Sequence, residues 1–139
     1  MSEFQDRNRK LIEQFRANRD KGEANRMPMP LVILTTTGAK SGKSHATPVR
    51  IFMDGDKPYV IASKGGAPSH PDWYRNLVAY PEVTVELGKE TFKAKAVVAS
   101  GKERDRLFKQ AVAEAPGFGE YQANTTREIP VVVLERERA

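Results

Sequence analysis

The chain has 139 residues, of which 39% are hydrophobic and 29% charged, as expected for one globular domain. It contains no cysteine, which excludes disulfides and thiolate metal sites. Its net charge is +5, but most cations outside two loops have acidic neighbours, as in GKERDR and LERERA. We therefore expect no nucleic-acid partner.

Residues 1–30 are expected to form an amphipathic helix followed by a mobile linker. Over residues 2–20 the apolar side chains recur at helical spacing, at Phe4, Leu11, Ile12 and Phe15. This helix would pack on its own domain. Its basic, amphipathic character is also compatible with contact between residues 1–20 and the inner face of the cell membrane. No apolar run approaches the ~20 residues that cross a bilayer, so we expect a cytoplasmic protein.

The remaining residues, 31–139, are predicted to form a mainly β domain of the α+β class. β-branched or alternating segments predict six strands, over residues 31–37, 46–53, 58–63, 83–87, 91–99 and 129–135. Two further helices are predicted over residues 72–80 and 101–114. Because long helices do not alternate with the strands, a parallel doubly wound sheet is disfavoured. An antiparallel barrel or rolled sheet with peripheral helices is the expected architecture.

Acidic residues are nearly absent from the middle of the chain: between Glu23 and Asp72 there are only Asp54 and Asp56. Two glycine-rich loops, residues 38–44 (GAKSGKS) and 64–71 (KGGAPSHP), lie in this window. The cations in and around them are Lys40, Lys43, His45, Arg50 and Lys64. Gly-rich backbone can turn N–H groups toward an anion, and ammonium groups add charge-assisted hydrogen bonds. These loops therefore predict a site for a phosphorylated or carboxylated small molecule.

The turn at residues 54–56 (DGD) is a strong hairpin signal. We expect this hairpin to bring the two loops to the ends of neighbouring strands. The first loop resembles a Walker A motif, but it has three residues between its glycines instead of four, and a predicted strand instead of a helix follows it. A nucleotide triphosphatase is therefore rejected, while a plain solvated turn remains an alternative.

Aromatic and histidine residues near these loops allow more than one interpretation. Trp73 and Tyr74 belong either to the core or to the wall of a planar ligand site. His45 and His70 have no suitably spaced partners, so no metal site is expected.

Three blocks of the sequence together resemble the deazaflavin-dependent nitroreductases, which bind coenzyme F420 on a split β-barrel. The blocks are TTTGAKSGKSHATPV, DGDKPYVIASKGGAPSHPDWYRNLVAYPEVTVELG and YQANTTREIPVVVLER. The resemblance covers residues 31 to 136 in matching order. It implies a six-stranded antiparallel split barrel. It also implies an enzyme of actinobacterial type that transfers a hydride from reduced F420 to a quinone, a nitroaromatic or another electron-poor acceptor.

The resemblance also implies the roles of individual residues. The cofactor's phosphate and tail would contact Ala39, Lys40, Ser41, His45, Ala46 and Thr47. The deazaflavin and ribityl chain would lie along Ile61, Ala62, Ser63 and Lys64. The helix that follows would contribute N–H groups and packing through Asp72, Trp73, Tyr74, Arg75 and Asn76, while Phe118 would approach the ring.

Proton delivery to the acceptor is assigned to Ser63 or Tyr121, with water as a competitor. The chain departs from its relatives on this side of the site. It has Ala115 and Phe118 where tyrosines are common, and Arg50 at a position that can be tyrosine. Two alternatives follow: an FMN-binding oxidoreductase on the same architecture, and a protein that binds the cofactor without turnover.

Overall fold

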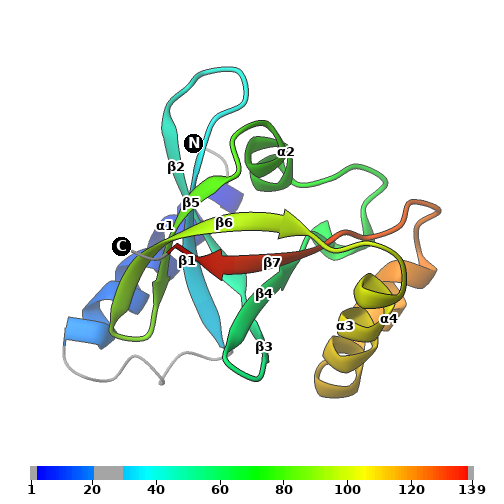
Figure 1. Cartoon of the computed structure of the whole chain (residues 1–139). Helices are drawn as coiled ribbons and strands as arrows, with labels where there is room; N and C mark the ends of the chain where they lie inside the picture. The colour runs from blue at the N-terminus through cyan, green and yellow to red at the C-terminus, as the bar shows by residue number, and fades with distance from the viewer. Residues whose placement is uncertain (1–2, 21–29, 138–139) are drawn as a thin grey trace.

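The computed structural model describes residues 3–20 and 30–137. Within these residues, one antiparallel sheet of seven strands curls into a half-barrel, in the order β2-β1-β5-β6-β7-β4-β3 (Figure 1). The strands are β1 (Leu31–Thr37), β2 (Ser44–Arg50), β3 (Phe52–Asp54), β4 (Lys57–Ile61), β5 (Glu82–Leu87), β6 (Glu90–Val98) and β7 (Val131–Arg136). The predicted antiparallel fold is confirmed, with seven strands in place of six.

The additional strand arises because the predicted strand over residues 46–53 divides at Ile51. Residues before Ile51 pair with β1, and residues after it pair with β4 at the other end of the sheet. The inside–outside alternation continues through the break, since Val49 and Ile51 are both buried. Only the pairing partner changes. Hydropathy alone could not reveal this division, because the alternation of buried and exposed side chains continues unbroken through Ile51.

Ile51 also forces the sheet to curl. It is the only residue between β2 and β3, the two end strands of the sheet. In a flat sheet these strands would lie six spacings apart, about 29 Å, whereas a single intervening residue spans only ~7 Å between the flanking Cα atoms. The ends must therefore approach one another. The Ile51 N–H donates to the Pro30 carbonyl at 3.0 Å, which ties the crossing segment to the start of β1.

Four α-helices and one 3₁₀ turn surround the sheet in the described residues. They are α1 (Glu3–Asp20), the 3₁₀ turn η1 (Lys64–Gly66), α2 (Asp72–Ala79), α3 (Gly101–Glu114) and α4 (Gly117–Ala123). Figure 1 shows α2 near the tip of the β1–β2 hairpin, and α3 beside α4 at the far end of β7. The predictions of α1, α2 and α3 are confirmed. Helix α4 was not predicted, because two glycines in GFGEYQA oppose helix formation.

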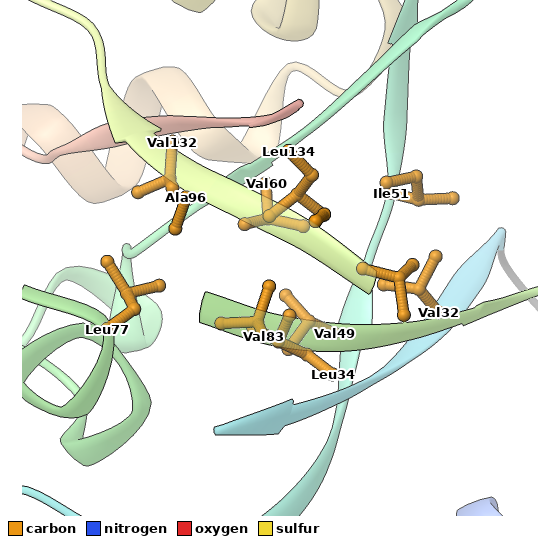
Figure 2. Close-up of a cluster of buried hydrophobic side chains, with 12 residues drawn as sticks. Val32, Leu34, Val49, Ile51, Val60, Leu77, Val83, Ala96, Val132 and Leu134 are labelled. Atoms are coloured by element: carbon orange, nitrogen blue, oxygen red, sulfur yellow. The ribbon is translucent and has the colours of Figure 1, made fainter. Parts of the chain in front are cut away.

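The sheet separates two hydrophobic clusters. The larger one fills the inside of the half-barrel and includes Val32, Leu34, Val60 and Leu77 (Figure 2). The second lies between the outer face of the sheet and the pair α3–α4, and its members are Phe52, Tyr59, Ile61, Leu107, Phe108, Ala111, Ile129 and Val131. Along β4 and β7 the side chains alternate between the two clusters: Val60 and Val132 belong to the inner one, and Tyr59, Ile61 and Val131 to the outer one. The outer face near β3 and β4 is thus covered by helices and not by solvent.

Helix α1 packs on the domain through Phe15, of which only 1% is exposed. Next to it, Arg16 forms a bidentate ion pair with Glu86 on β5, with nitrogen–oxygen distances of 3.0 and 2.8 Å. Leu11 and Ile12 are half-buried. The apolar side of the helix is therefore turned at least partly toward the protein. No helix within the described residues is long and apolar enough to cross a membrane.

Truncating Phe15 tests this packing. We expect Phe15→Ala to lower the free energy of unfolding by about 3–5 kcal/mol, the usual cost of removing a buried phenyl group. Urea unfolding followed by circular dichroism would measure the loss. Gln14→Ala, at an exposed position of the same helix, is the control and should change stability little. An equally stable Phe15→Ala protein would show that α1 contributes nothing to the folded domain.

Candidate functional site

The first loop, residues 38–43, folds back on itself at the end of β1. The Gly38 N–H donates to the Lys43 carbonyl at 2.7 Å, and the Gly42 N–H donates to the Gly38 carbonyl at 2.9 Å. A Cβ atom at Gly38 would collide with Ser41 Oγ and lie 2.9 Å from His45 Nε2. Ser41 Oγ and His45 Nε2 share a hydrogen bond of 3.3 Å. The tight turn therefore requires glycine and gathers Ser41 and His45 at one place.

Among residues 3–20 and 30–137, no acidic side chain pairs with the lysines of the two loops. None of the ion pairs found among the described residues involves Lys40, Lys43 or Lys64. All three side chains are exposed, and Lys64 Nζ donates only to Ser69 Oγ, at 3.2 Å. In contrast, Arg106 is neutralised by Asp54 and Glu103, each at 2.9 Å. Positive charge is thus available for a ligand at the loops.

Helix α2 holds the first loop through Asn76. The Ala39 N–H donates to Asn76 Oδ1 at 3.0 Å, and Asn76 Nδ2 donates to Thr36 Oγ1 at 3.2 Å. Thr36 is 1% exposed, so this contact lies at the base of the loop. Trp73 and Tyr74 are half-buried and pack against the inner cluster. One amide side chain therefore connects the loop, the strand and the helix.

Arg127 holds the second loop. Its guanidinium donates to the carbonyls of Ala62 at 3.2 Å, Ser63 at 2.7 Å and Ala67 at 2.9 Å. A fourth contact, at 3.0 Å, joins Arg127 Nη1 to His70 Nδ1. Since arginine can only donate, His70 must accept at Nδ1. A single side chain thus satisfies three carbonyls on both sides of η1 and shapes the loop that contains Ser63 and Lys64.

Helix α4 packs against η1 and brings two predicted site residues to it. Gly66 has φ +83°, and a Cβ atom there would lie 2.9 Å from the Tyr121 carbonyl. Only glycine permits this approach. Phe118 and Tyr121 are half-buried and meet edge to face at 5.3 Å between centroids, and Phe118 meets Phe52 in the same way at 5.3 Å. An aromatic wall therefore runs from α4 to β3.

The predicted site residues fall into two groups joined by α2. Around the first loop, Thr47 is half-buried, and the exposed members are Ala39, Lys40, Ser41, His45 and Ala46. Around the second, Ile61 and Ala62 are buried, Lys64 is exposed and the half-buried members are Ser63, Phe118 and Tyr121. On α2, Trp73, Tyr74 and Asn76 are half-buried, and Asp72 and Arg75 are exposed and paired with each other at 3.3 Å.

One expectation about this arrangement was wrong. The DGD hairpin forms, but it joins β3 to β4, so the two loops do not end hydrogen-bonded neighbouring strands. In the sheet order, β5, β6 and β7 lie between β1 and β4. The strand break at Ile51 is the reason. Curling of the sheet and the connection through α2, which directly follows the second loop, link the loops instead.

An open hollow of about 450 Å³ is partly lined by Arg127. It is lined by Gly101, Arg104, Asp105, Gln122, Thr126, Arg127 and Glu128, and none of these is a predicted site residue. Both cations in its lining are already bonded: Arg104 to the Ile129 carbonyl and to Gln122, at 2.8 and 2.7 Å, and Arg127 to the carbonyls of the second loop region. This hollow therefore offers little free binding capacity. No group of three or more metal-ligating side chains occurs in the described residues.

Comparison with known proteins decides the family. The family model described as F420H(2)-dependent quinone reductase matches residues 7–136. The chain belongs to this family. The F420H(2)-dependent quinone reductase Rv1261c of Mycobacterium tuberculosis is 42% identical over 111 residues, which cover 77% of this chain and 74% of that protein. The resemblance found in the sequence is thereby confirmed.

Solved structures agree with this assignment. An F420-H2-dependent reductase, FDR-A, is 43% identical and superimposes with a TM-score of 0.70, over 76% of this chain and 94% of its own. A second structure, described as a domain-swapped dimer, is 38% identical with a TM-score of 0.74, over 90% of this chain and 96% of its own.

The residues present fit a multiply anionic coenzyme such as F420. The first loop offers exposed ammonium groups without acidic partners, together with hydroxyl and imidazole side chains, which suit phosphate and carboxylate oxygens. The second loop offers the buried Ile61 and Ala62 beside half-buried aromatic rings, which suit a planar ring system. This quinone reductase family member therefore separates a charged half of the site from an apolar half.

Sequence reasoning missed the role of Arg127. It named Phe118 and Tyr121 separately but did not predict that they form one aromatic wall with Phe52. Arg127 lies in TTREIP, just before the last predicted strand, and nothing local indicates that it reaches carbonyls 60 to 65 positions away. Phe52 was assigned only to a strand, and its contact with Phe118 depends on the tertiary fold. No sequence pattern of this one chain could have identified either.

The Arg127–His70 contact predicts a pH effect on stability. Burial, followed by the charges of Arg127 and Arg75, lowers the pKa of His70 below its ordinary 6.5 in the folded state. The unfolded chain then binds a proton at higher pH than the folded one. His70 should therefore cost stability as pH falls from about 7 through 6.5 toward its folded pKa, and cost no more below that.

His70→Asn keeps an acceptor for Arg127 but cannot titrate. Thermal melts of both proteins between pH 7.5 and 5 should show a steeper loss of stability for the parent protein. Parallel pH profiles for the parent and His70→Asn would contradict the expected shift.

Proposed function

We propose that this chain transfers a hydride from reduced coenzyme F420 to a quinone or another electron-poor small molecule. The family match over residues 7–136 carries the proposal, because it spans both loops, α2 and α4. The loop lysines, which form no ion pair in the described residues, and the aromatic wall support it independently, since they suit the charged and planar ends of such a coenzyme. The expected cytoplasmic location stays a prediction.

The residues divide the work of the reaction as follows. Coenzyme F420, when bound, supplies the hydride, so the protein's task is to position the reactants and exclude water. The first loop and Asn76 hold the anionic phosphate and tail through Lys40, Ser41 and His45. The second loop, kept in shape by Arg127, presents Ile61 and Ser63 to the ring. Phe118 and Tyr121 close the opposite side.

The acceptor also needs a proton after it has received the hydride. Ser63 Oγ and Tyr121 Oη are the hydroxyl groups of the second loop and α4 that we assign as donors, and both side chains are half-buried. Half-burial keeps a hydroxyl in contact with solvent, so either group can be reprotonated from water between turnovers.

Charge reversal at the loops tests the cofactor assignment. Lys40→Glu combined with Lys64→Glu should weaken F420 binding by about one to two orders of magnitude, because two charge-assisted contacts become repulsive. Titration by cofactor fluorescence would measure this, and raising the salt concentration should narrow the difference. Lys102→Glu with Lys109→Glu, exposed on α3, has the same net charge and is the control. Equal affinities in the two double variants would refute the placement of the coenzyme.

A direct comparison of cofactors tests the function itself. The purified protein should bind F420 more tightly than FMN, and should oxidise reduced F420 when 1,4-naphthoquinone is added, as followed by the return of F420 absorbance. Preference for FMN would replace the proposal with a flavin enzyme. Tight F420 binding without oxidation by quinone or nitroaromatic acceptors would instead identify a non-catalytic binding protein.

A further inference from the structure

Arg50 carries an unexplained buried donor beside the proposed ring site. Its Nε is inaccessible to solvent and has no hydrogen-bond partner in the part of the chain that the structure describes, where it is the sole such side-chain atom. Burying an N–H without an acceptor costs about 1–3 kcal/mol. Such an atom in an otherwise satisfied structure indicates a partner that is not part of the chain.

The fold places Arg50 on the outer face of the sheet. Its neighbours Val49 and Ile51 point into the inner cluster, as Figure 2 shows, and alternation therefore sends Arg50 to the other side, with Phe52. The Arg50 guanidinium carbon lies 5.2 Å from the centroid of the Phe52 ring. Phe52 in turn contacts Phe118, which contacts Tyr121. Arg50 thus lies at the β3 end of the aromatic wall, and Tyr121, a proposed proton donor, lies at the α4 end.

Arg50 also lies at an open seam of the half-barrel. Pairing between β3 and β4 stops at Phe52 and Tyr59. Extending this antiparallel register by two residues places Arg50 opposite Ile61. At Ile61, β4 is paired with β7 but no longer with β3 in the described residues. Ile61 belongs to the same outer cluster as Phe52, and Ser63 follows it by two positions, at the start of the 3₁₀ turn η1. A guanidinium therefore sits across an unpaired strand edge from the residues proposed to line the ring.

We propose that Arg50 binds the electron acceptor and stabilises the negative charge that forms on its oxygen. This inference rests on the proposed function. A quinone that receives a hydride gains two electrons and one proton and becomes a hydroquinone anion. Reduced F420, which gives up the hydride, is oxidised. A proton from Tyr121, Ser63 or water then completes the hydroquinone. A planar guanidinium stacked on an aromatic ring can donate to that oxygen while the quinone ring packs on the same wall.

The acceptor class follows from this chemistry. Acceptors should be planar and should concentrate charge on an oxygen after reduction, as quinones do. A cation at the wall selects for oxygen atoms able to accept hydrogen bonds and against acceptors that become positively charged.

Binding without turnover separates this role from others. The protein is loaded with oxidised F420, so that no hydride can move, and 1,4-naphthoquinone binding is measured by equilibrium dialysis. The chain has no cysteine that would add to the quinone. We expect Arg50→Met to weaken quinone binding about tenfold to hundredfold and to lower kcat/KM at least as much. Arg50→Lys keeps the charge but not the planar guanidinium. Its quinone affinity should lie between those of the parent protein and Arg50→Met.

A matched control is available on the same sheet. Arg136 lies over Phe92 at 4.0 Å and bonds to Glu90 at 2.8 Å, so Arg136→Met removes a similar arginine–phenylalanine contact elsewhere. It should leave quinone binding unchanged. F420 affinity in the absence of quinone should stay within about threefold in every variant. Thermal melts should show little loss of stability for Arg50→Met, because Nε has no hydrogen-bond partner among the described residues and only the contact with the Phe52 ring is removed.

Several outcomes would overturn the proposal. Unchanged quinone binding in Arg50→Met would do so, and so would a lowered melting temperature without a change in quinone affinity, which indicates a structural role. Weaker F420 binding in the absence of quinone would assign Arg50 to the cofactor. If the parent protein binds no quinone at all, the Arg50 proposal fails. If it binds quinone without reducing it, only the proposed function fails, and the dialysis result still decides the role of Arg50.

Discussion

The covalent link through Ile51 is the constraint on which the rest of the structure depends. Two strands at opposite ends of a seven-stranded sheet are one residue apart in the chain, so the sheet has to curl. Curling encloses the inner cluster and leaves a seam where β2 gives way to β3. The outer face beside that seam is covered by α3 and α4 and carries Phe52 and Ile61, and Ser63 follows at the start of η1. The position of the proposed ring site therefore follows from chain connectivity.

Two side chains then turn this scaffold into a candidate site. Asn76 ties the first loop to β1 and α2, and Arg127 ties the second loop to the segment that leads into β7. Both work by satisfying backbone groups that a loop would otherwise leave to water. Because the ties come from elements distant in sequence, the loops have defined shapes without strand pairing between them. The site is thus built by polar contacts added to a fold that hydrophobic burial supplies.

Sequence reasoning succeeded where the signal is local and failed where it is tertiary. The strand at 31–37, the DGD turn and the helix at 101–114 follow from β-branching, turn chemistry and helical periodicity, and all three occur. The change of partner at Ile51 left no trace in hydropathy, so one predicted strand was two. Helix α4 contains two glycines and exists because Phe118 and Tyr121 pack on the outer cluster. The acid-poor window pointed to cationic loops, but only the fold showed that Lys40, Lys43 and Lys64 have no acidic partners within the described part of the chain.

The unequal anchoring of the two loops has a thermodynamic consequence. Arg127 binds three carbonyls in and directly before the second loop, whereas the first loop is held to the body by the Ala39–Asn76 contact and by the exposed Ser41–His45 hydrogen bond. If the coenzyme binds as we propose, conformational entropy at the ring end is lost during folding, before any ligand arrives, while at the tail end part of it is lost only upon association. A coenzyme whose appendage varies in length would meet a rigid receptor at its reactive end and an adaptable one at its periphery.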